Sequence, residues 1–320
     1  MDIRSTASDR LSLSPTRVAI LGAGQWGAAL AMLARNRGHQ VQVWSRRGET
    51  TLEAALASAE IVIAAISMKG VPETVERVRA SMLPDTAILV SATKGLDPAT
   101  QLTASPIWQA ALPNHPIVVL SGPNLSEEIQ QGLPAATVVA SHDQAAAERA
   151  QAILSSDRFR VYTNTDPLGT EMGGTLKNVI AIAAGVCDGL HLGTNARSGL
   201  ITRALAEIIR VGTHLGARPE TFFGLAGLGD LLATCTSPLS RNYRVGYGLA
   251  QGKPLEQILT ELQSTAEGVS TTNVLIELAE RKSIAVPVSR QVYLLLNDKI
   301  TPKQAVEALM ERDLKAEMYG

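Results

Sequence analysis

The sequence predicts an α/β fold with a doubly wound sheet in the first half of the chain and an all-α domain in the second. In the first half, short runs rich in Val and Ile alternate with helix-like segments. This alternation is typical of buried parallel strands connected by helices. After about Asn164 the strand-like runs stop and longer helical periodicity follows. We therefore expect a tail over residues 1–15, a sheet domain over 16–166 and a helical domain over 167–320.

The expected strands are short, apolar and bounded by polar or turn-forming residues. They are Val18–Leu21, Gln40–Trp44, Ile61–Ile66, Ala87–Ala92, Ile117–Ser121, Ala136–Ala140 and Phe159–Tyr162. The helices expected between them are Trp26–Asn36, Leu52–Ser58, Pro72–Ser81, Ala99–Ala110, Leu125–Gln131 and Gln144–Leu154. In the second domain we expect helices at Thr170–Gly189, Leu200–Leu215, Arg241–Gly252, Glu256–Leu262, Thr271–Lys282 and Pro302–Glu311.

A glycine-rich turn follows the first expected strand, in the stretch R-V-A-I-L-G-A-G-Q-W-G over residues 17–27. A G-x-G-x-x-G pattern between a strand and a helix is the context in which it indicates dinucleotide binding. Gly22 allows the tight turn, Gly24 lets the backbone approach a pyrophosphate, and Gly27 lets the helix pack against the strand. The free N–H groups at the helix start favour the phosphates. The turn predicts a Rossmann-like domain.

The second expected strand ends in Ser45, Arg46 and Arg47. An Asp or Glu at this distance from the glycines usually binds the ribose 2′-hydroxyl of NAD. Arginine instead attracts a 2′-phosphate and can stack on adenine. The pattern therefore favours NADP(H), with NAD(H) possible. The alternative is that the two arginines at this strand end are simply solvated and bind no cofactor.

The bulk composition excludes several classes of function. The 320 residues carry a net charge of −1, so nothing indicates a nucleic-acid or membrane-surface partner. Cys187 and Cys235 lack metal-ligand spacing and read as reduced cysteines of a cytoplasmic protein, and we expect no metal site. The first residues lack the apolar core of a secretory signal, and no apolar run is long enough to span a membrane.

Polar residues follow two further strands. Ser91-Ala92-Thr93-Lys94-Gly95-Leu96 ends the fourth strand, which places Lys94 where ligands bind in open α/β sheets. Ser121-Gly122-Pro123-Asn124-Leu125-Ser126 ends the fifth, and Asn124 is expected to cap the next helix. Alternatively, Lys94 could be a solvated loop lysine, and the stretch around Asn124 could be an ordinary capping turn.

Two stretches of the helical domain carry reactive groups. Gly173-Gly174-Thr175-Leu176-Lys177-Asn178 places a lysine on an apolar helix, where burial lowers its pKa and makes it usable as an acid or base. Gly227-Leu228-Gly229-Asp230 precedes Ser240-Arg241-Asn242. A helix start with a serine and a guanidinium suits an anion. Glu267 opens a later helix and is a weak signal alone. Lys177 could instead extend to solvent, and Ser240 could be only a cap.

Taken together, these stretches resemble the bacterial NAD(P)-dependent glycerol-3-phosphate dehydrogenases. The resemblance rests on G-A-G-Q-W-G-A-A-L, S-A-T-K-G-L, S-G-P-N, G-G-T-L-K-N-V-I-A-I, G-L-G-D-L-L-A-T-C and S-R-N, in that order from about Arg17 to Val288. It implies a Rossmann domain, a helical substrate domain and reversible reduction of dihydroxyacetone phosphate. It also implies supply of glycerol 3-phosphate for phospholipid synthesis.

The resemblance also implies roles for individual residues. Lys177 matches the catalytic acid/base lysine. The substrate site would comprise Lys94, Gly122, Asn124, Lys177, Asp230, Ser240, Arg241 and Asn242. The cofactor site would comprise Gly22, Gly24, Gln25, Trp26, Gly27, Arg46, Arg47, Lys94, Ser126, Arg241 and Glu267. A homodimer is left open.

The chain departs from the family pattern after the second strand. Only Gly48–Ser58 separates Arg47 from the third strand, where the family usually has a longer segment, and the third strand ends in Ala65-Ile66-Ser67-Met68. Two other functions remain open at this point. One is a related β-hydroxyacid or ketopantoate-type reductase, which would need a carboxylate site. The other is a non-catalytic NADP-sensing module.

Overall fold

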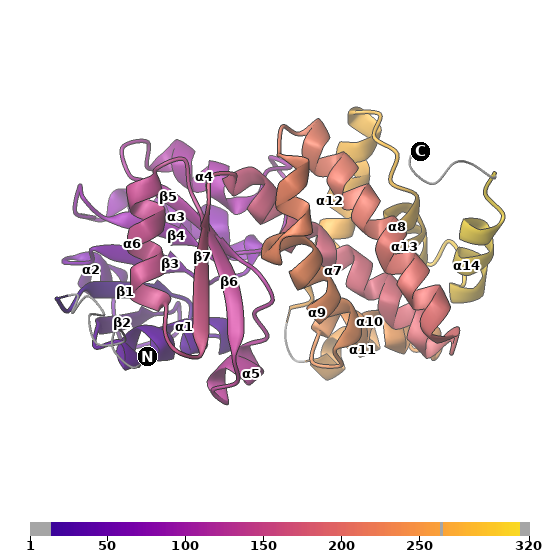
Figure 1. The fold of residues 1–320 in the computed structure, drawn as a ribbon, viewed down its shortest axis with the longest axis horizontal. Coiled ribbons are helices and arrows are strands. Elements are labelled where there is room, and N and C mark those ends of the chain that lie inside the picture. The colour runs from indigo at the N-terminus through magenta and orange to yellow at the C-terminus, as the bar shows by residue number, and fades with distance from the viewer. Residues whose placement is uncertain (1–13, 263–264, 314–320) are drawn as a thin grey trace, which may run out of the picture.

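The computed structural model describes residues 14–262 and 265–313 (Figure 1). Most of the tail expected over residues 1–15 lies outside the described residues.

A seven-stranded sheet occupies the first half of the chain, in the order β2-β1-β3-β4-β5-β6-β7. The strands are β1 (Arg17–Leu21), β2 (Gln40–Trp44), β3 (Ile61–Ala64), β4 (Ile88–Ser91), β5 (Ile117–Ser121), β6 (Ala135–Ala140) and β7 (Phe159–Asn164). Neighbouring strands are parallel except β5 and β6, which pair antiparallel. Because β1 lies between β2 and β3, the strand order reverses beside β1. Open α/β sheets bind ligands at such a reversal.

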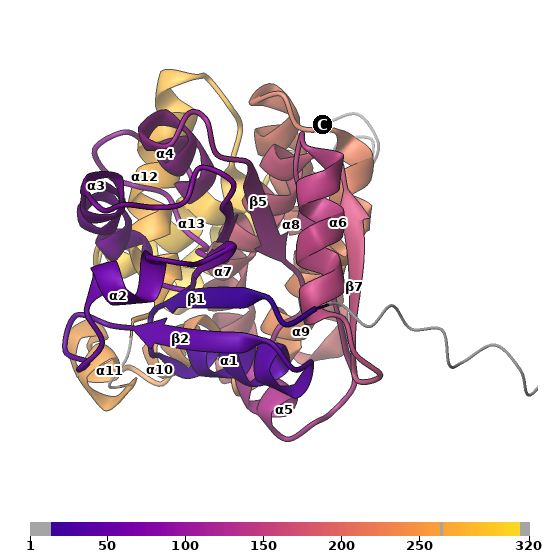
Figure 2. The same cartoon turned by 90° about the vertical axis from the view of Figure 1, so that its left-hand side faces the viewer.

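Helices cover both faces of the sheet (Figure 2). One face carries α1 (Gln25–Asn36), α5 (Ser126–Gln130) and α6 (Gln144–Leu154), and the other carries α2 (Leu52–Leu56), α3 (Val71–Ala80) and α4 (Ala104–Ala111). Along β1, Val18 and Ile20 join the first apolar cluster, whereas Ala19 and Leu21 join the second. This alternation follows from the two-residue period of a strand. The doubly wound sheet predicted from the sequence is confirmed.

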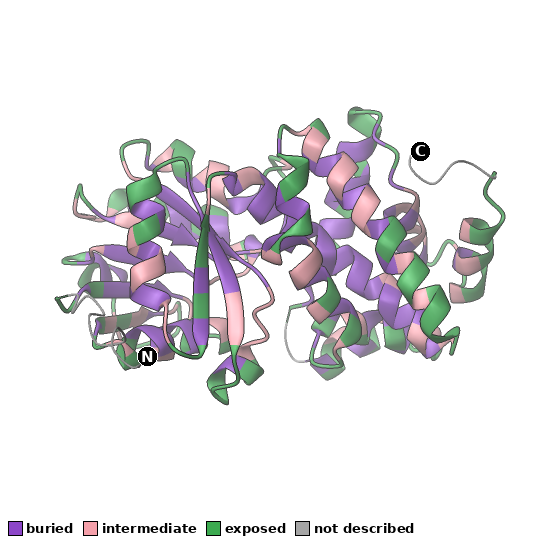
Figure 3. Ribbon diagram, in the orientation of Figure 1, coloured by how far each residue is buried: buried purple, intermediate pink, exposed green. Residues whose placement is uncertain are grey.

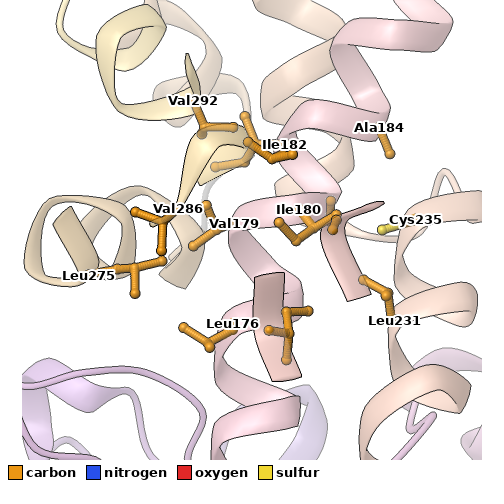
Figure 4. Packing of buried hydrophobic residues seen from close by; sticks show 14 of the residues in the cluster. Leu176, Val179, Ile180, Ile182, Ala184, Leu231, Cys235, Leu275, Val286 and Val292 are labelled. Atoms are coloured by element: carbon orange, nitrogen blue, oxygen red, sulfur yellow. The ribbon is translucent and has the colours of Figure 1, made fainter. Parts of the chain in front are cut away.

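The second half of the chain is helical, and α7 (Pro167–Gly189) runs through its centre, buried along almost its whole length (Figure 3). Its apolar side chains pack against α9, α12 and α13 (Figure 4). The other helices are α8 (Gly193–His214), α9 (Asp230–Thr236), α10 (Arg241–Ala250), α11 (Leu255–Leu262), α12 (Glu267–Arg281), α13 (Pro287–Leu296) and α14 (Pro302–Met310), with short turns at Pro219–Phe223 and Leu225–Gly229. Among the described residues, none of these helices is long and apolar enough to cross a membrane.

Several element predictions need correction. The helix expected at Ala99–Ala110 begins only at Ala104, because Asp97 accepts hydrogen bonds from Thr100 and Gln101 adopts a φ of 58°. The expected helices omitted α9 and α13. A glycine-rich run precedes α9 and obscures its start in the sequence. The packing of α7 against α9 and α13 becomes visible only in the structure.

Helices α7 and α10 cross at two glycines. A Cβ atom at Gly246 would lie 1.8 Å from the carbonyl oxygen of Ile182, and one at Gly185 would lie 2.0 Å from that of Tyr243. The backbones therefore touch directly at this crossing, and no side chain fits between them. The contact fixes where α10 begins relative to α7.

We predict that Gly246→Ala lowers the free energy of unfolding by about 1–3 kcal/mol or more, because the added methyl group overpacks the crossing. Thermal or urea unfolding measures the change. Gly199→Ala is the matched control: Gly199 is exposed on α8 and its Cβ would meet nothing within 4 Å. The control should be neutral or slightly stabilising. Equal effects of the two changes would contradict the packing argument.

Candidate active site

The glycine turn between β1 and α1 has the geometry predicted for dinucleotide binding. Gly22 adopts a φ of 116°, and a Cβ atom there would lie 2.4 Å from the Ala65 carbonyl oxygen. A Cβ atom at Gly27 would lie 1.9 Å from the Gly22 carbonyl oxygen. Gly24 precedes α1, supplies no side-chain cap and is open to solvent. The start of α1 is thus exposed and uncapped, which fits a pyrophosphate.

The residues around this turn belong to the same edge of the sheet. Gln25 is exposed, and its carbonyl oxygen accepts a hydrogen bond from Gln130 at 2.9 Å. Trp26 is half-buried against the apolar cluster under α1. Ser126 begins α5 and is half-buried.

Arg46 and Arg47 are both exposed just beyond the edge strand β2. Arg46 lies 3.7 Å from the carboxylate of Glu73. Beside them, the guanidinium of Arg77 lies 4.9 Å from the centre of the buried Trp44 ring. Lys94 follows β4, further along the same edge of the sheet. The arginines near the end of β2 and Lys94 at the end of β4 therefore mark different parts of the site.

Lys94 turns from the end of β4 toward the helical domain. Its ammonium donates hydrogen bonds to the Gly122 carbonyl oxygen at 3.1 Å and to Asp230 Oδ2 at 2.6 Å. Gly122 adopts a φ of 149°, and a Cβ atom there would lie 2.9 Å from Thr137 Oγ1. The structure therefore brings Lys94, Gly122 and Asp230 together, from three distant parts of the sequence.

Lys177 meets the same carboxylate from the other side. Its Nζ atom contacts Asp230 Oδ1 and donates to Thr234 Oγ1 at 2.7 Å. Asp230 is 1% exposed and Lys177 is 6% exposed. Burial lowers the pKa of Lys177 to about 7, helped by the charge of Lys94 and opposed by that of Asp230. Lys177 can therefore hold or release a proton near neutral pH.

The glycine pair before Lys177 explains how α7 comes so close to the sheet. A Cβ atom at Gly174 would lie 2.1 Å from Ser121 Oγ and 3.3 Å from Lys94 Cε. A Cβ atom at Gly173 would lie 2.5 Å from the carbonyl oxygen of Ala226, which belongs to the turn that leads to Asp230. Side chains at either position would separate the two lysines from Asp230.

Asn124 does not cap the following helix, as the sequence had suggested. Leu125 precedes α5 without a side-chain cap, and the Asn124 amide instead donates to Thr137 Oγ1 at 2.9 Å. Its Oδ1 atom is buried without a hydrogen-bond partner among the described residues. Thr137 in turn donates to the Ser121 carbonyl oxygen at 3.0 Å, so Asn124 is held across the end of β5.

Helix α10 begins as predicted. Ser240 is its N-cap and accepts a hydrogen bond from the Tyr243 N–H at 3.2 Å. Arg241 is exposed beside it. Asn242 is buried, donates to Asn178 Oδ1 at 2.9 Å and accepts from the Gly268 N–H at 2.9 Å. Asn242 thus connects the residue after Lys177 with the start of α12.

Glu267, the first residue of α12, lies beside the loop that carries Lys94. A Cβ atom at Gly95 would lie 3.4 Å from Glu267 Oε2. Burial raises the pKa of Glu267, while the N–H of Met68 and the charge of Arg241 act in the opposite direction. Glu267 therefore lies between the end of β3 and the start of α10.

Two contacts at the centre of the site were not assigned from the sequence. Thr234 follows Asp230 by four residues on α9, so the two share a helix face, and this spacing could have identified Thr234. Thr175 accepts a hydrogen bond from the Gly95 N–H at 3.1 Å. No sequence pattern indicates that pairing.

A separate cavity of about 860 Å³ lies among α7, α8, α13 and α14. Its walls are mainly apolar and include Leu200, Leu295 and Leu309. None of the site residues predicted from the sequence lines it. The clustered lysines and this cavity therefore lie in different parts of the helical half.

Comparison with known proteins is consistent with this geometry. Residues 17–53 and 47–147 match the model of the NAD-dependent glycerol-3-phosphate dehydrogenase N-terminus, and residues 166–307 match that of the C-terminus. A glycerol-3-phosphate dehydrogenase [NAD(P)+] from Synechocystis is 66% identical over 304 residues, which cover 95% of this chain and 96% of the relative. One from Acaryochloris marina is 64% identical, over 95% of this chain and 98% of the relative.

Solved structures agree with the sequence comparisons. The glycerol-3-phosphate dehydrogenase of Coxiella burnetii superposes with a TM-score of 0.89 at 34% identity, covering 93% of this chain and 99% of that one. A ketopantoate reductase from Ralstonia eutropha has a TM-score of 0.56 at 12% identity and covers 90% of this chain and 99% of that one, which shows likeness of fold alone. Both halves of the chain match one family, and the chain belongs to the NAD(P)-dependent glycerol-3-phosphate dehydrogenases.

Proposed function

We propose that this protein interconverts dihydroxyacetone phosphate and sn-glycerol 3-phosphate, using NAD(P)H. The observation that carries the proposal is the cluster of buried Lys177 and Asp230 with half-buried Lys94, which joins the sheet to the helical half. Family membership supplies the substrate class. The exposed start of α1 beyond Gly22 and Gly24 fits the cofactor, which supplies the hydride when bound.

Lys177 is the proposed proton donor. With a pKa lowered to about 7, it is partly protonated at neutral pH and can give its proton to the oxygen of the substrate carbonyl. Asp230 and Thr234 hold the ammonium group in place from two directions. In glycerol 3-phosphate oxidation, neutral Lys177 accepts the proton instead.

The start of α10 is the proposed site for the substrate phosphate. Ser240 caps the helix, the helix dipole favours an anion, and the exposed Arg241 can supply a bidentate guanidinium. The other residues of the proposed substrate site are Lys94, Gly122, Asn124 and Asn242. Fixing the phosphate there places the carbonyl relative to Lys177.

The preference for NADP(H) over NAD(H) rests on Arg46 and Arg47, which are exposed beyond β2 as a 2′-phosphate would require. The other proposed cofactor contacts are Gln25, Trp26, Ser126 and Glu267. Lys94 and Arg241 are proposed to contact both the cofactor and the substrate. We also propose a cytoplasmic location, supported by two buried free cysteines. The proposed role is the supply of glycerol 3-phosphate for phospholipid synthesis. Cell fractionation tests the location, and light scattering tests the homodimer left open by the sequence.

Of the predictions that test this proposal, the first concerns the proton donor. Catalytic efficiency for ketone reduction should fall as pH rises through about 7, because Lys177 loses its proton there, and that for alcohol oxidation should rise over the same range. Lys177→Ala should remove this dependence and lower kcat by about 10²- to 10⁴-fold. Steady-state rates from pH 5 to about 9 check both.

Cofactor affinity, measured by NADPH fluorescence titration, is the control for Lys177→Ala and should change little. A variant with near-wild-type kcat would show that another group donates the proton.

The second prediction tests the function itself. Wild-type enzyme should reduce dihydroxyacetone phosphate far more efficiently than dihydroxyacetone or ketopantoate. Arg241→Ala should lower kcat/KM for the phosphorylated substrate by the equivalent of about 2–5 kcal/mol, and Arg241→Lys should also be impaired because lysine lacks the planar fork.

Arg244→Ala is the matched control, since Arg244 is exposed one turn further along α10. Equal efficiency with and without the phosphate would refute the phosphate site. Preference for ketopantoate would indicate the reductase alternative, and tight NADPH binding without turnover would indicate the sensing module.

The third prediction concerns the cofactor. Replacing Arg46 and Arg47 by Ala together should raise KM for NADPH much more than KM for NADH, because only NADPH carries the 2′-phosphate. Arg79→Ala, an exposed change on α3, is the control. Equal weakening for both cofactors would mean that the two arginines do not recognise the 2′-phosphate.

A further inference from the structure

The loop between β4 and α4, which carries Lys94, is attached to α7 at both of its ends. Near its start, the Gly95 N–H donates to Thr175 Oγ1 at 3.1 Å. Just past its end, the Ser105 N–H donates to Glu171 Oε1 at 2.9 Å, and the Ser105 hydroxyl donates to Glu171 Oε2. Glu171 and Thr175 are four residues apart, so they lie on one side of α7.

Packing leaves little freedom at the first attachment. A Cβ atom at Gly95 would lie 2.9 Å from Met68 Cβ, so the backbone of the loop is confined between Met68 and α7. The stem of Lys94 passes close to Gly174, whose Cβ would lie 3.3 Å from Lys94 Cε. The residue that follows Lys94 is therefore bonded to the same turn of α7 that the Lys94 side chain crosses.

The two residues of α7 that make these attachments are shielded from water. Thr175 is 0% exposed and Glu171 is 1% exposed. Burial also raises the pKa of Glu171, although the hydrogen bonds from Ser105 oppose the shift. Without the Thr175 hydroxyl, the buried Gly95 N–H would lose its acceptor, and a buried donor without a partner is unfavourable. The loop would be expected to shift to recover a partner.

We propose that Thr175 is a positioning residue that acts on the reaction through Lys94. Its hydroxyl fixes the backbone beside Lys94, and this directs the ammonium to Asp230 and to the Gly122 carbonyl oxygen. The inference rests on the role proposed above for Lys94 in the substrate site.

The test starts from Thr175→Val, which keeps the shape of the side chain and removes the acceptor. Catalytic efficiency for dihydroxyacetone phosphate should fall by about 5- to 100-fold, the range expected for one unsatisfied buried donor. Because the resemblance also places Lys94 at the cofactor, NADPH affinity in fluorescence titration should fall no further than it does in Lys94→Met. Thr175→Ser, which restores the hydroxyl, should recover most of the lost efficiency.

Thr170→Val is the matched control. Thr170 is also 0% exposed on α7, but its hydroxyl has no hydrogen-bond partner within the described part of the chain. The same chemical change there should leave efficiency unchanged. Melting temperatures of all variants separate loss of folding from loss of positioning. A deficit in Thr175→Val that Thr175→Ser does not repair would overturn the proposal.

A double-mutant cycle with Lys94→Met decides whether Thr175 acts through Lys94. If it does, Thr175→Val should reduce efficiency by less than about twofold in the Lys94→Met background. A full additional loss in that background would overturn the inference while leaving the role of Lys94 intact. Wild-type efficiency of Lys94→Met alone would refute the role of Lys94 and the inference with it.

Discussion

The carboxylate of Asp230 is the group on which the proposed active site depends. It is almost fully buried and contacts the ammonium groups of Lys94 and Lys177 on its two oxygens. A buried carboxylate is stable only when it is paired and hydrogen-bonded. Because Lys94 belongs to the sheet domain and Lys177 to the helical half, pairing both lysines with Asp230 requires the two parts to meet closely.

The glycines of α7 follow from that requirement. Gly174 lies against Ser121 and the stem of Lys94, and Gly173 lies against the backbone before Asp230. Thr175 then binds the loop behind Lys94. On the cofactor side, Gly22 and Gly27 bring α1 against β1 by the same kind of contact. In both places a glycine without a side chain lets a helix lie close to the ends of the strands. The helix α1 approaches with its N-terminus, and α7 approaches with one face.

How much the sequence predicts depends on the range of the interactions involved. The turn at Gly22, the helix Gln144–Leu154 and the start of α10 at Arg241 depend on neighbours within a few residues, and the structure has them as predicted. The Asn124 cap was wrong because a partner on β6, Thr137, holds the amide instead. The antiparallel pairing of β6 and the bond between Thr175 and Gly95 also depend on distant segments. A buried apolar strand reads the same in either direction, so its sequence carries no sign of that pairing.

The two lysines have different roles in the charge balance of the proposed reaction. Before proton transfer, Asp230 faces two cations, and burial together with the charge of Lys94 lowers the pKa of Lys177 to about 7. When Lys177 gives up its proton, Asp230 is still paired with Lys94. The buried carboxylate is therefore never left without a cation. Lys94 thus lowers the pKa of the proposed donor and also stabilises the state that remains after the proton has left.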